Sequence, residues 1–147
     1  MRNPYKQGIF KPIHIEKYKG THPIIYRSAL ELSFMRWVDN NSRILEWGSE
    51  SIIIPYIKPV LSNTKPKIHR YYPDFNITML TEAGPKKYLI EVKPARQTQP
   101  PKPRKGKNTL REQYTYAVND AKWKAASAWC KSNNYNFQIL TEKDLPN

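Results

Sequence analysis

Two short apolar segments decide the fold of this chain: Arg70-Tyr71-Tyr72-Pro73-Asp74-Phe75-Asn76-Ile77-Thr78 and Tyr88-Leu89-Ile90-Glu91-Val92-Lys93. Each segment has the length and composition of a β-strand, yet together they contain three charged residues, Asp74, Glu91 and Lys93. A charged side chain within a buried strand is costly unless it is paired or binds a metal ion. These three residues therefore mark a candidate functional site.

The alternation of side chains along a strand predicts how these residues meet. Glu91 and Lys93 are two positions apart and share one face, whereas Val92 points to the other. If the two segments form an antiparallel hairpin with its turn at Gly84-Pro85, Asp74 reaches the face of Glu91. Two carboxylates and an amine can hold a divalent metal ion and a water molecule, with the Val92 backbone carbonyl as a further ligand.

Composition and charge indicate the class of protein. The chain has 147 residues, which predicts one domain spanning 1–147. Lysine and arginine number 25 against 12 acidic residues, so the formal net charge is +13. Such a charge indicates a polyanionic partner, most simply nucleic acid, and the alternative is a basic protein without one.

Other classes of protein lack support in the sequence. We expect no membrane helix, because no apolar segment is long enough, and no signal peptide. The single cysteine, Cys130, excludes an internal disulfide and fits a reducing compartment. The three histidines are scattered, so we expect no zinc site.

A helix is predicted to begin at Ser28, which forms a capping-box pattern with Glu31. An apolar stripe follows, and polar residues 39–42 end the helix. Glu31 has two explanations. It reciprocates the Ser28 cap, which the spacing alone favours, or it provides a further carboxylate beside Asp74 and Glu91.

The remaining elements complete the predicted order helix, strand, strand, strand, helix, strand. The β-branched run at 51–57 reads as a strand, with Pro55 placing it at an edge or a bulge. Glu50 precedes it and is a second candidate carboxylate, although an ordinary strand-end charge is the favoured interpretation. Asn119 is the predicted N-cap of a helix through Ser132, while 110–118 can be helical or irregular. Its predicted buried stripe is Ala121, Ala125, Ala128 and Trp129, and the last strand is 137–140.

Two basic segments flank this core. Residues 1–25 predict a basic N-terminal arm, where Lys6, Lys11, Lys17 and Lys19 either contact phosphate or lie in a solvated tail. Residues 94–110 form a proline-rich basic loop, and no acidic residue occurs from Val92 to Arg111. Prolines keep this loop extended, so it can follow a phosphate backbone. The alternative is a surface loop without a partner.

At the hairpin the chain resembles the PD-(D/E)XK nuclease superfamily, since it contains Pro73-Asp74 and, 17 positions after the aspartate, Glu91-Val92-Lys93. The superfamily has the core order α-β-β-β-α-β that we predict here. Longer segments are similar to the head-completion nucleases of T-even-type tailed phages and, more distantly, to the transposase nuclease subunit that cuts transposon ends. These segments include Ile25-Tyr26-Arg27-Ser28, Trp47-Gly48-Ser49-Glu50, His69-Arg70-Tyr71-Tyr72-Pro73-Asp74-Phe75, Glu91-Val92-Lys93-Pro94 and Ala121-Lys122-Trp123.

The resemblance implies a restriction-endonuclease-like α/β fold with a mixed sheet flanked by helices. It also implies a deoxyribonuclease that depends on Mg²⁺, for which Mn²⁺ substitutes. Asp74, Glu91, Lys93 and Glu31 would be catalytic, and the metal ligands would be Asp74, Glu91, Glu31 and the Val92 carbonyl. We expect DNA contacts from the basic residues Arg27, Arg70, Arg96, Lys102, Arg104, Lys105, Lys107 and Arg111.

The implied role is to cut or trim packaged double-stranded DNA during phage head completion, before heads and tails join. The expected partners are phage head or portal proteins. The expected location is the cytoplasm of the infected bacterial host, with retention in the virion head as an alternative. A different hypothesis is a structural head or portal component that uses a nuclease-like fold only to bind DNA or capsid protein. The intact set of Asp74, Glu91 and Lys93 favours the enzyme.

Overall fold

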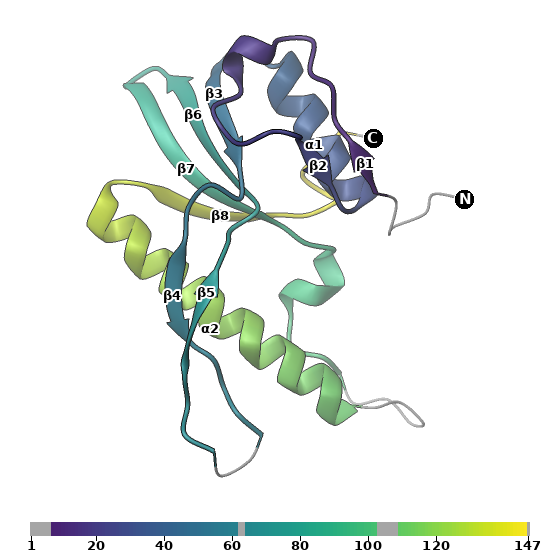
Figure 1. Cartoon of the computed structure of the whole chain (residues 1–147), viewed down its shortest axis with the longest axis vertical. Coiled ribbons are helices and arrows are strands. Elements are labelled where there is room, and N and C mark those ends of the chain that lie inside the picture. Colours follow the sequence, from purple (N-terminus) through teal and green to yellow (C-terminus); the bar gives the residue numbers. More distant parts are fainter. Residues whose placement is uncertain (1–6, 62–63, 103–108, 147) are drawn as a thin grey trace.

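A four-stranded mixed sheet forms the centre of the computed structural model, which describes residues 7–61, 64–102 and 109–146 (Figure 1). The strand order is β3-β6-β7-β8, in which β3–β6 and β6–β7 are antiparallel and β7–β8 is parallel. Two helices complete the core order α-β-β-β-α-β, which confirms the predicted fold class. The core elements are α1 (Ala29–Asn40), β3 (Ile44–Ser49), β6 (Phe75–Thr81), β7 (Gly84–Val92), α2 (Thr109–Asn133) and β8 (Asn136–Leu140).

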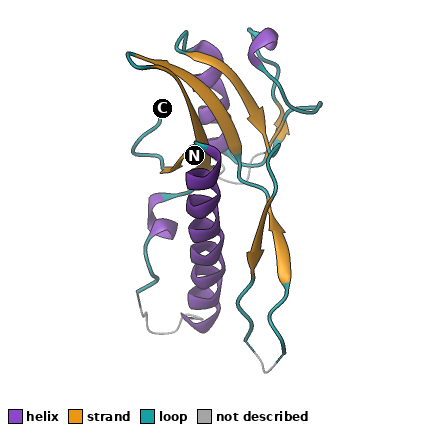
Figure 2. Cartoon of the chain, turned by 90° about the vertical axis from the view of Figure 1, so that its left-hand side faces the viewer, coloured by secondary structure: helices purple, strands orange, loops and turns teal. Residues whose placement is uncertain are grey.

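Each face of the sheet is covered by one helix (Figure 2). On the first face, α1 buries Phe34, Met35 and Val38 in a cluster that includes Phe75 and Ile90. On the second face, α2 forms a cluster with the sheet and with residues between 52 and 71, and this cluster includes Leu89, Val118, Trp123, Ala126 and Cys130. Because Leu89 and Ile90 point to opposite faces, the alternation places Glu91 on the α2 face.

The predicted hairpin exists, but its turn lies two residues earlier than expected. β6 and β7 pair from Phe75↔Ile90 to Thr81↔Gly84, so Glu82 and Ala83 form the turn and Gly84 begins β7 with φ +103°. Pro85 lies within β7 opposite Leu80. Its missing N–H removes no sheet bond on the other side, because β8 pairs with β7 only from Tyr88 onward.

The strand predicted at 51–57 lies outside the main sheet, which is a correction to the sequence analysis. The core strand is β3, and Glu50 follows it with φ 51°. The chain then forms β4 (Ile54–Ile57), which pairs antiparallel with β5 (Ile68–Tyr71) in a separate two-stranded ribbon (Figure 1). Pro55 is on an edge strand, as predicted, because β4 pairs only with β5 among the described strands.

Helix α2 begins ten positions before its predicted N-cap, so Asn119 lies in the middle of a 25-residue helix. The early part of the helix runs beside the ribbon, where the Tyr114 hydroxyl donates to the Pro59 carbonyl at 2.9 Å. The predicted stripe is partly wrong: Ala128 is exposed, while larger residues, Val118 and Trp123, are buried. The alanines marked a helix face, but packing on the ribbon and sheet uses these bulkier side chains.

The N-terminal segment was expected to be a basic arm, but its described part packs on the body of the protein. β1 (Gly8–Ile9) pairs with β2 (Ile25–Tyr26), and a short 3₁₀ helix, η1 (Ile15–Lys17), lies between them. The side chains of Phe10, Tyr18 and Ile24 are buried in the α1 cluster. Lys6 lies outside the described residues.

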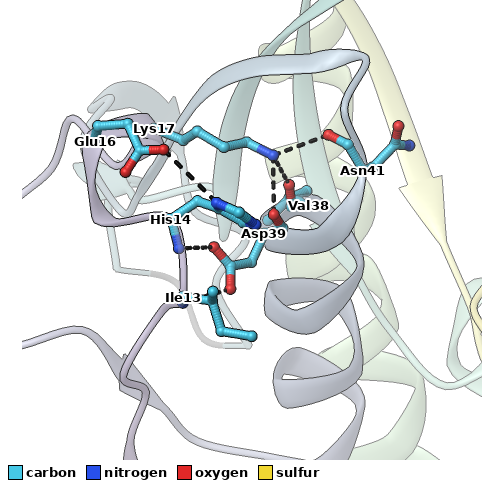
Figure 3. A network of polar contacts seen from close by, with 7 residues as sticks. All are labelled: Ile13, His14, Glu16, Lys17, Val38, Asp39 and Asn41. Carbon is cyan, nitrogen blue, oxygen red and sulfur yellow. Dashed lines mark hydrogen bonds and ion pairs between the residues drawn. The ribbon is translucent and has the colours of Figure 1, made fainter.

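Lys17 secures this segment to the end of α1 (Figure 3). Its ammonium group donates to the carbonyls of Val38 at 2.6 Å, Asp39 at 3.1 Å and Asn41 at 2.9 Å. The Asp39 carboxylate in turn accepts the N–H groups of Ile13 at 2.8 Å and His14 at 2.9 Å. Carbonyls at a helix C-terminus lack intrahelical donors and favour a cation. Lys17 is therefore a helix-capping residue, whereas the sequence left a phosphate contact open for it.

Replacing Lys17 by methionine, which keeps the aliphatic chain, should destabilise the protein by about 2 kcal/mol, because the carbonyls at the end of α1 lose a charged donor. Urea unfolding followed by circular dichroism measures this change. Lys19 is exposed and serves as the matched control, so Lys19→Met should change the free energy of unfolding by less than about 0.5 kcal/mol. Equal effects of the two substitutions would contradict the capping role.

Candidate active site

The two carboxylates of the hairpin lie opposite each other where β6 begins and β7 ends. The register that pairs Phe75 with Ile90 brings Asp74 next to Glu91. The Asp74 N–H donates to Glu91 Oε1 at 3.4 Å, and the Val92 N–H donates to Asp74 Oδ2 at 2.8 Å. Backbone groups of each strand thus hold the carboxylate of the other, as the antiparallel arrangement predicts.

Tyr71 and Lys93 approach the two oxygens of Glu91 separately. The Tyr71 hydroxyl donates to Oε1 at 2.8 Å, and Lys93 Nζ lies 4.0 Å from Oε2. Glu91 is only 5% exposed, so these contacts matter for a charge that has lost most of its water. The backbone of Lys93 is also fixed, because its N–H donates to the Leu140 carbonyl of β8 at 2.9 Å. The sequence analysis missed Tyr71, which belongs to the ribbon strand β5.

Electrostatics at the pair favour a bound cation. Burial raises the pKa of Asp74 well above its usual range, and the charges of Glu91 and Glu31 raise it further. The Val92 N–H and the Lys93 ammonium lower the pKa of Asp74 and only partly oppose this shift. Burial also raises the pKa of Tyr71, with Glu91 adding to the effect, so this hydroxyl stays protonated as a donor. Two close carboxylates of this kind are stabilised by an added positive charge.

Glu31 lies close to the pair but is turned toward its own helix. Ser28 Oγ accepts the Glu31 N–H at 3.0 Å, so the predicted cap is present. The Glu31 carboxylate accepts the Arg27 N–H at 3.1 Å, one residue before the partner of a standard capping box. Burial raises the pKa of Glu31, and the charges of Glu50 and Glu91 also raise it. Glu31 is therefore within electrostatic reach of the site while capping α1.

Glu50 and Arg27 form an ion pair beside Glu31. Arg27 Nη1 lies 2.6 Å from Glu50 Oε1, and both side chains are 40–50% exposed. The Glu50 N–H donates to the Asp74 carbonyl at 3.0 Å, where Glu50 adopts its positive φ. This bond ties the end of β3 to the residue that carries the first carboxylate.

Mg²⁺ prefers hard oxygen ligands, retains several waters and needs only one or two carboxylates. Asp74 and Glu91 provide these two carboxylates, and the Val92 carbonyl lies at the end of the same strand. Within the residues that the structure describes, no three acidic, histidine or cysteine side chains are grouped closely enough to hold a metal ion. The pair fits such a cation, but the structure does not assemble Glu31 with it as a third side-chain ligand.

Comparison of the sequence with known proteins identifies its family. Residues 41–142 match the model of the family described as TnsA-like endonuclease N terminal. The chain belongs to this family of endonucleases. It is also 40% identical over 145 residues to the head completion nuclease of Enterobacteria phage T4, covering 94% of this chain and 92% of that protein. Both resemblances, to the phage nucleases and to the transposase nuclease subunit, are confirmed.

The endonuclease family match includes Asp74, Glu91 and Lys93, whereas Glu31 precedes it. It also includes Lys122 of α2, a residue that the sequence analysis did not assign to the site. Lys122 Nζ lies 5.7 Å from the ring centroid of Tyr71 and 5.9 Å from that of Tyr56. Burial lowers the pKa of Lys122, while the charges of Glu91 and Asp74 raise it. The sequence signal that could have identified Lys122 was the presence of a lysine on the face of a helix that packs against the rest of the protein.

The predicted DNA-binding residues of this endonuclease fall into three groups. Four of them are exposed, namely Arg70 on β5, Arg96 on the 3₁₀ helix η2 (Ala95–Thr98), Lys102 before α2, and Arg111 on α2. Arg27 is paired with Glu50 beside the site. Arg104, Lys105 and Lys107 lie outside the described residues.

Among the described helices, none has the length and apolarity needed to cross a membrane.

Replacing Asp74 by asparagine should stabilise the metal-free protein at pH 7.5. Because the pKa of Asp74 is raised in the folded state, the unfolded chain releases this proton first. The stability that the protonated group contributes is present below about pH 4 and is lost as the pH rises through the folded pKa. In EDTA at pH 7.5, Asp74→Asn should therefore melt about 3 °C or more above the parent.

The difference in melting temperature should shrink as the pH falls toward 5. Glu82 is exposed in the hairpin turn at the opposite end of β7, so Glu82→Gln is the matched control and should show no such dependence. A melting temperature of Asp74→Asn below that of the parent at every pH would rule out the predicted cost of burying an ionised Asp74 beside Glu91.

Proposed function

We propose that this protein is a Mg²⁺-dependent deoxyribonuclease that hydrolyses phosphodiester bonds of double-stranded DNA and acts in phage head completion. The observation that carries the proposal is the opposed pair of Asp74 and Glu91 with Lys93 beside it, in a chain of an endonuclease family. The name of the T4 relative supports the role in head completion. Cutting or trimming of packaged DNA before head–tail joining, with head or portal proteins as partners, follows as part of this proposal.

In this proposal, Asp74, Glu91 and the Val92 carbonyl hold the cation. When bound, Mg²⁺ or Mn²⁺ would polarise the phosphate and lower the pKa of a water molecule. Tyr71 fixes the orientation of Glu91 by donating to Oε1, which leaves Oε2 on the side of Lys93. Glu31 remains a proposed member of the catalytic set, beside Asp74, Glu91 and Lys93. Its carboxylate is close enough to interact electrostatically with the pair.

Lys93 is proposed to orient the attacking water and to contact the scissile phosphate. Its ammonium group lies 4.0 Å from Glu91 Oε2, and its side chain is 27% exposed, so it borders both the carboxylates and solvent. A fixed cation at this position would stabilise the negative charge that develops on the phosphate during cleavage. Its backbone bond to β8 limits the motion of the residue and so reduces the reorganisation needed for reaction.

DNA is proposed to approach across the exposed basic residues around this end of the sheet. Arg70 precedes Asp74 by four positions, and Arg96 follows Lys93 by three. Lys102 and Arg111 are further exposed cations, and the sequence between them adds Arg104, Lys105 and Lys107, consistent with a net charge of +13 and a duplex as a polyanion. No acidic residue lies between Val92 and Arg111 to repel phosphate.

Plasmid cleavage with Mg²⁺ tests the site directly. Asp74→Ala, Glu91→Ala and Lys93→Ala should each lower the cleavage rate by at least about 100-fold, because each removes a cation ligand or a stabilising charge. EDTA should abolish cutting by the parent, and Mn²⁺ should restore it. Unchanged cutting by all three variants would refute the assigned site. If the parent fails to cut DNA with any of the metal ions tested, the result would favour the structural head component.

The binding of the cation has a readout that does not depend on cleavage. Saturating Mg²⁺ should raise the melting temperature of the parent by several degrees, because a ligand of the folded state stabilises it. The same Mg²⁺ should leave Glu91→Gln almost unchanged and should act fully on the turn control Glu82→Gln.

Lys122→Met should lower kcat/KM about tenfold or more, because Lys122 places a positive charge beside Tyr71 and Glu91. Lys124 is exposed on the same helix and paired with Asp120 at 2.8 Å, so Lys124→Met is the matched control. Lys122→Arg should recover part of the rate while Lys122→Met does not. Equal loss in Lys122→Met and Lys122→Arg, with lowered melting temperatures in both, would indicate a packing role alone.

A further inference from the structure

The ribbon of β4 and β5 is the largest feature that the proposed chemistry leaves unexplained. It extends away from the main sheet beside α2 (Figures 1 and 2). The sequence from Ser51 to Pro73, which contains the ribbon, has no acidic residue. It does contain four cationic side chains, namely Lys58, Lys65, Lys67 and Arg70.

The two faces of the ribbon differ. Ile54, Tyr56 and Tyr71 are buried in the α2 cluster, which holds one face against the helix. On the other face Pro55 pairs with Arg70 and Ile57 with Ile68, and these four residues are exposed. Ile57 is 64% and Ile68 is 74% exposed, so two adjacent aliphatic side chains face solvent. The outer face thus combines an apolar patch with a basic residue.

The ribbon is rooted in the active site. Tyr71, the last residue of β5, donates to Glu91, and Asp74 follows three positions later. Residues 67–70 extend about 10 Å along a strand away from this point. Phosphates along one DNA strand are about 3.4 Å apart along the helix axis. Arg70 is one position from Tyr71 and Lys67 is four, so the two cations lie about 3 Å and about 13 Å from it along the strand, which matches phosphates roughly one and four base pairs away.

We propose that this ribbon is an arm that binds duplex DNA beside the cleavage site, an inference that rests on the proposed function. The major groove admits a two-stranded β-ribbon, and the outer face would enter it with Ile57 and Ile68 against the base edges. Lys67 and Arg70 contact the adjoining phosphates. The ribbon thereby holds the duplex in register with the site.

The charges favour DNA over a protein partner as the occupant of this face. None of Lys58, Lys65, Lys67 and Arg70 is ion-paired within the part of the chain that the structure describes. Like charges on a narrow ribbon repel each other, and a polyanion relieves this repulsion while releasing its own counterions. Surfaces that bind proteins are typically depleted of lysine, whereas three of these four residues are lysines.

Fluorescence anisotropy with a 30-base-pair duplex in EDTA tests the proposal without cleavage. The double variant Lys67→Ser/Arg70→Ser should bind about tenfold more weakly and reduce the slope of log K against log salt by about two, since two phosphate contacts are lost. Ile57→Ser/Ile68→Ser should weaken binding with little change of slope. Lys86→Ser/Lys131→Ser removes the same charge from exposed positions away from the site and should have much smaller effects.

A second measurement uses the single cysteine of the chain, which is 2% exposed. A photo-crosslinker attached at Ile68→Cys should crosslink to the duplex, and one attached at Lys86→Cys should not. Ribbon variants that bind DNA like the parent, or equal crosslinking from the two positions, would overturn the proposal. So would a ribbon variant that keeps DNA affinity but loses self-association in sedimentation, because the face would then bind protein. If the parent never cuts DNA but the ribbon variants still bind it more weakly, the proposal of a DNA-binding arm stands and the proposal of nuclease activity is rejected.

Discussion

The hydrogen bonds that hold Asp74 and Glu91 against each other are the constraint on which the functional end of the molecule depends. Each carboxylate accepts a backbone N–H from the opposite strand, so movement of either one breaks a hydrogen bond that joins the two strands. Burial of the Asp74 carboxylate, together with the like charge of Glu91, opposes folding, as the raised pKa of Asp74 indicates. The pair persists because two hydrophobic layers, one on each face of the sheet, stabilise the strands that carry it.

The elements around the pair each fix one part of it. The end of β3 binds the Asp74 carbonyl through the Glu50 N–H, and β5 orients Glu91 through Tyr71. Helix α1 presents Glu31 from its first turn, where the Ser28 cap sets the direction of the chain. Helix α2 brings Lys122 from the other side. Parts of four elements thus converge on the two carboxylates.

The sequence predicts what is determined locally. The hairpin, the Ser28 cap and the approach of Asp74 to Glu91 follow from alternation and capping chemistry over a few residues. Tyr71 and Lys122 could not be assigned in this way, because their positions depend on how a ribbon and a helix pack together. The run at 51–57 has the composition of a core strand, but the chain turns at Glu50, which has a positive φ, and the run then pairs with β5 in the ribbon. In the sequence, Lys17 cannot be told from a solvated lysine, because the three carbonyls that it binds lie at the end of α1, 21 to 24 positions away.

The parallel pairing of β7 with β8 has a consequence for when the site forms. The backbone bond that fixes Lys93 is made by Leu140, near the end of the chain, and the long helix α2 separates the two strands. Contacts between residues so far apart form late, because a large loop must close first. Lys93 is thus fixed only once β8 has joined the sheet, so a partly folded chain in which β6 and β7 are paired already holds the two carboxylates without a fixed lysine beside them.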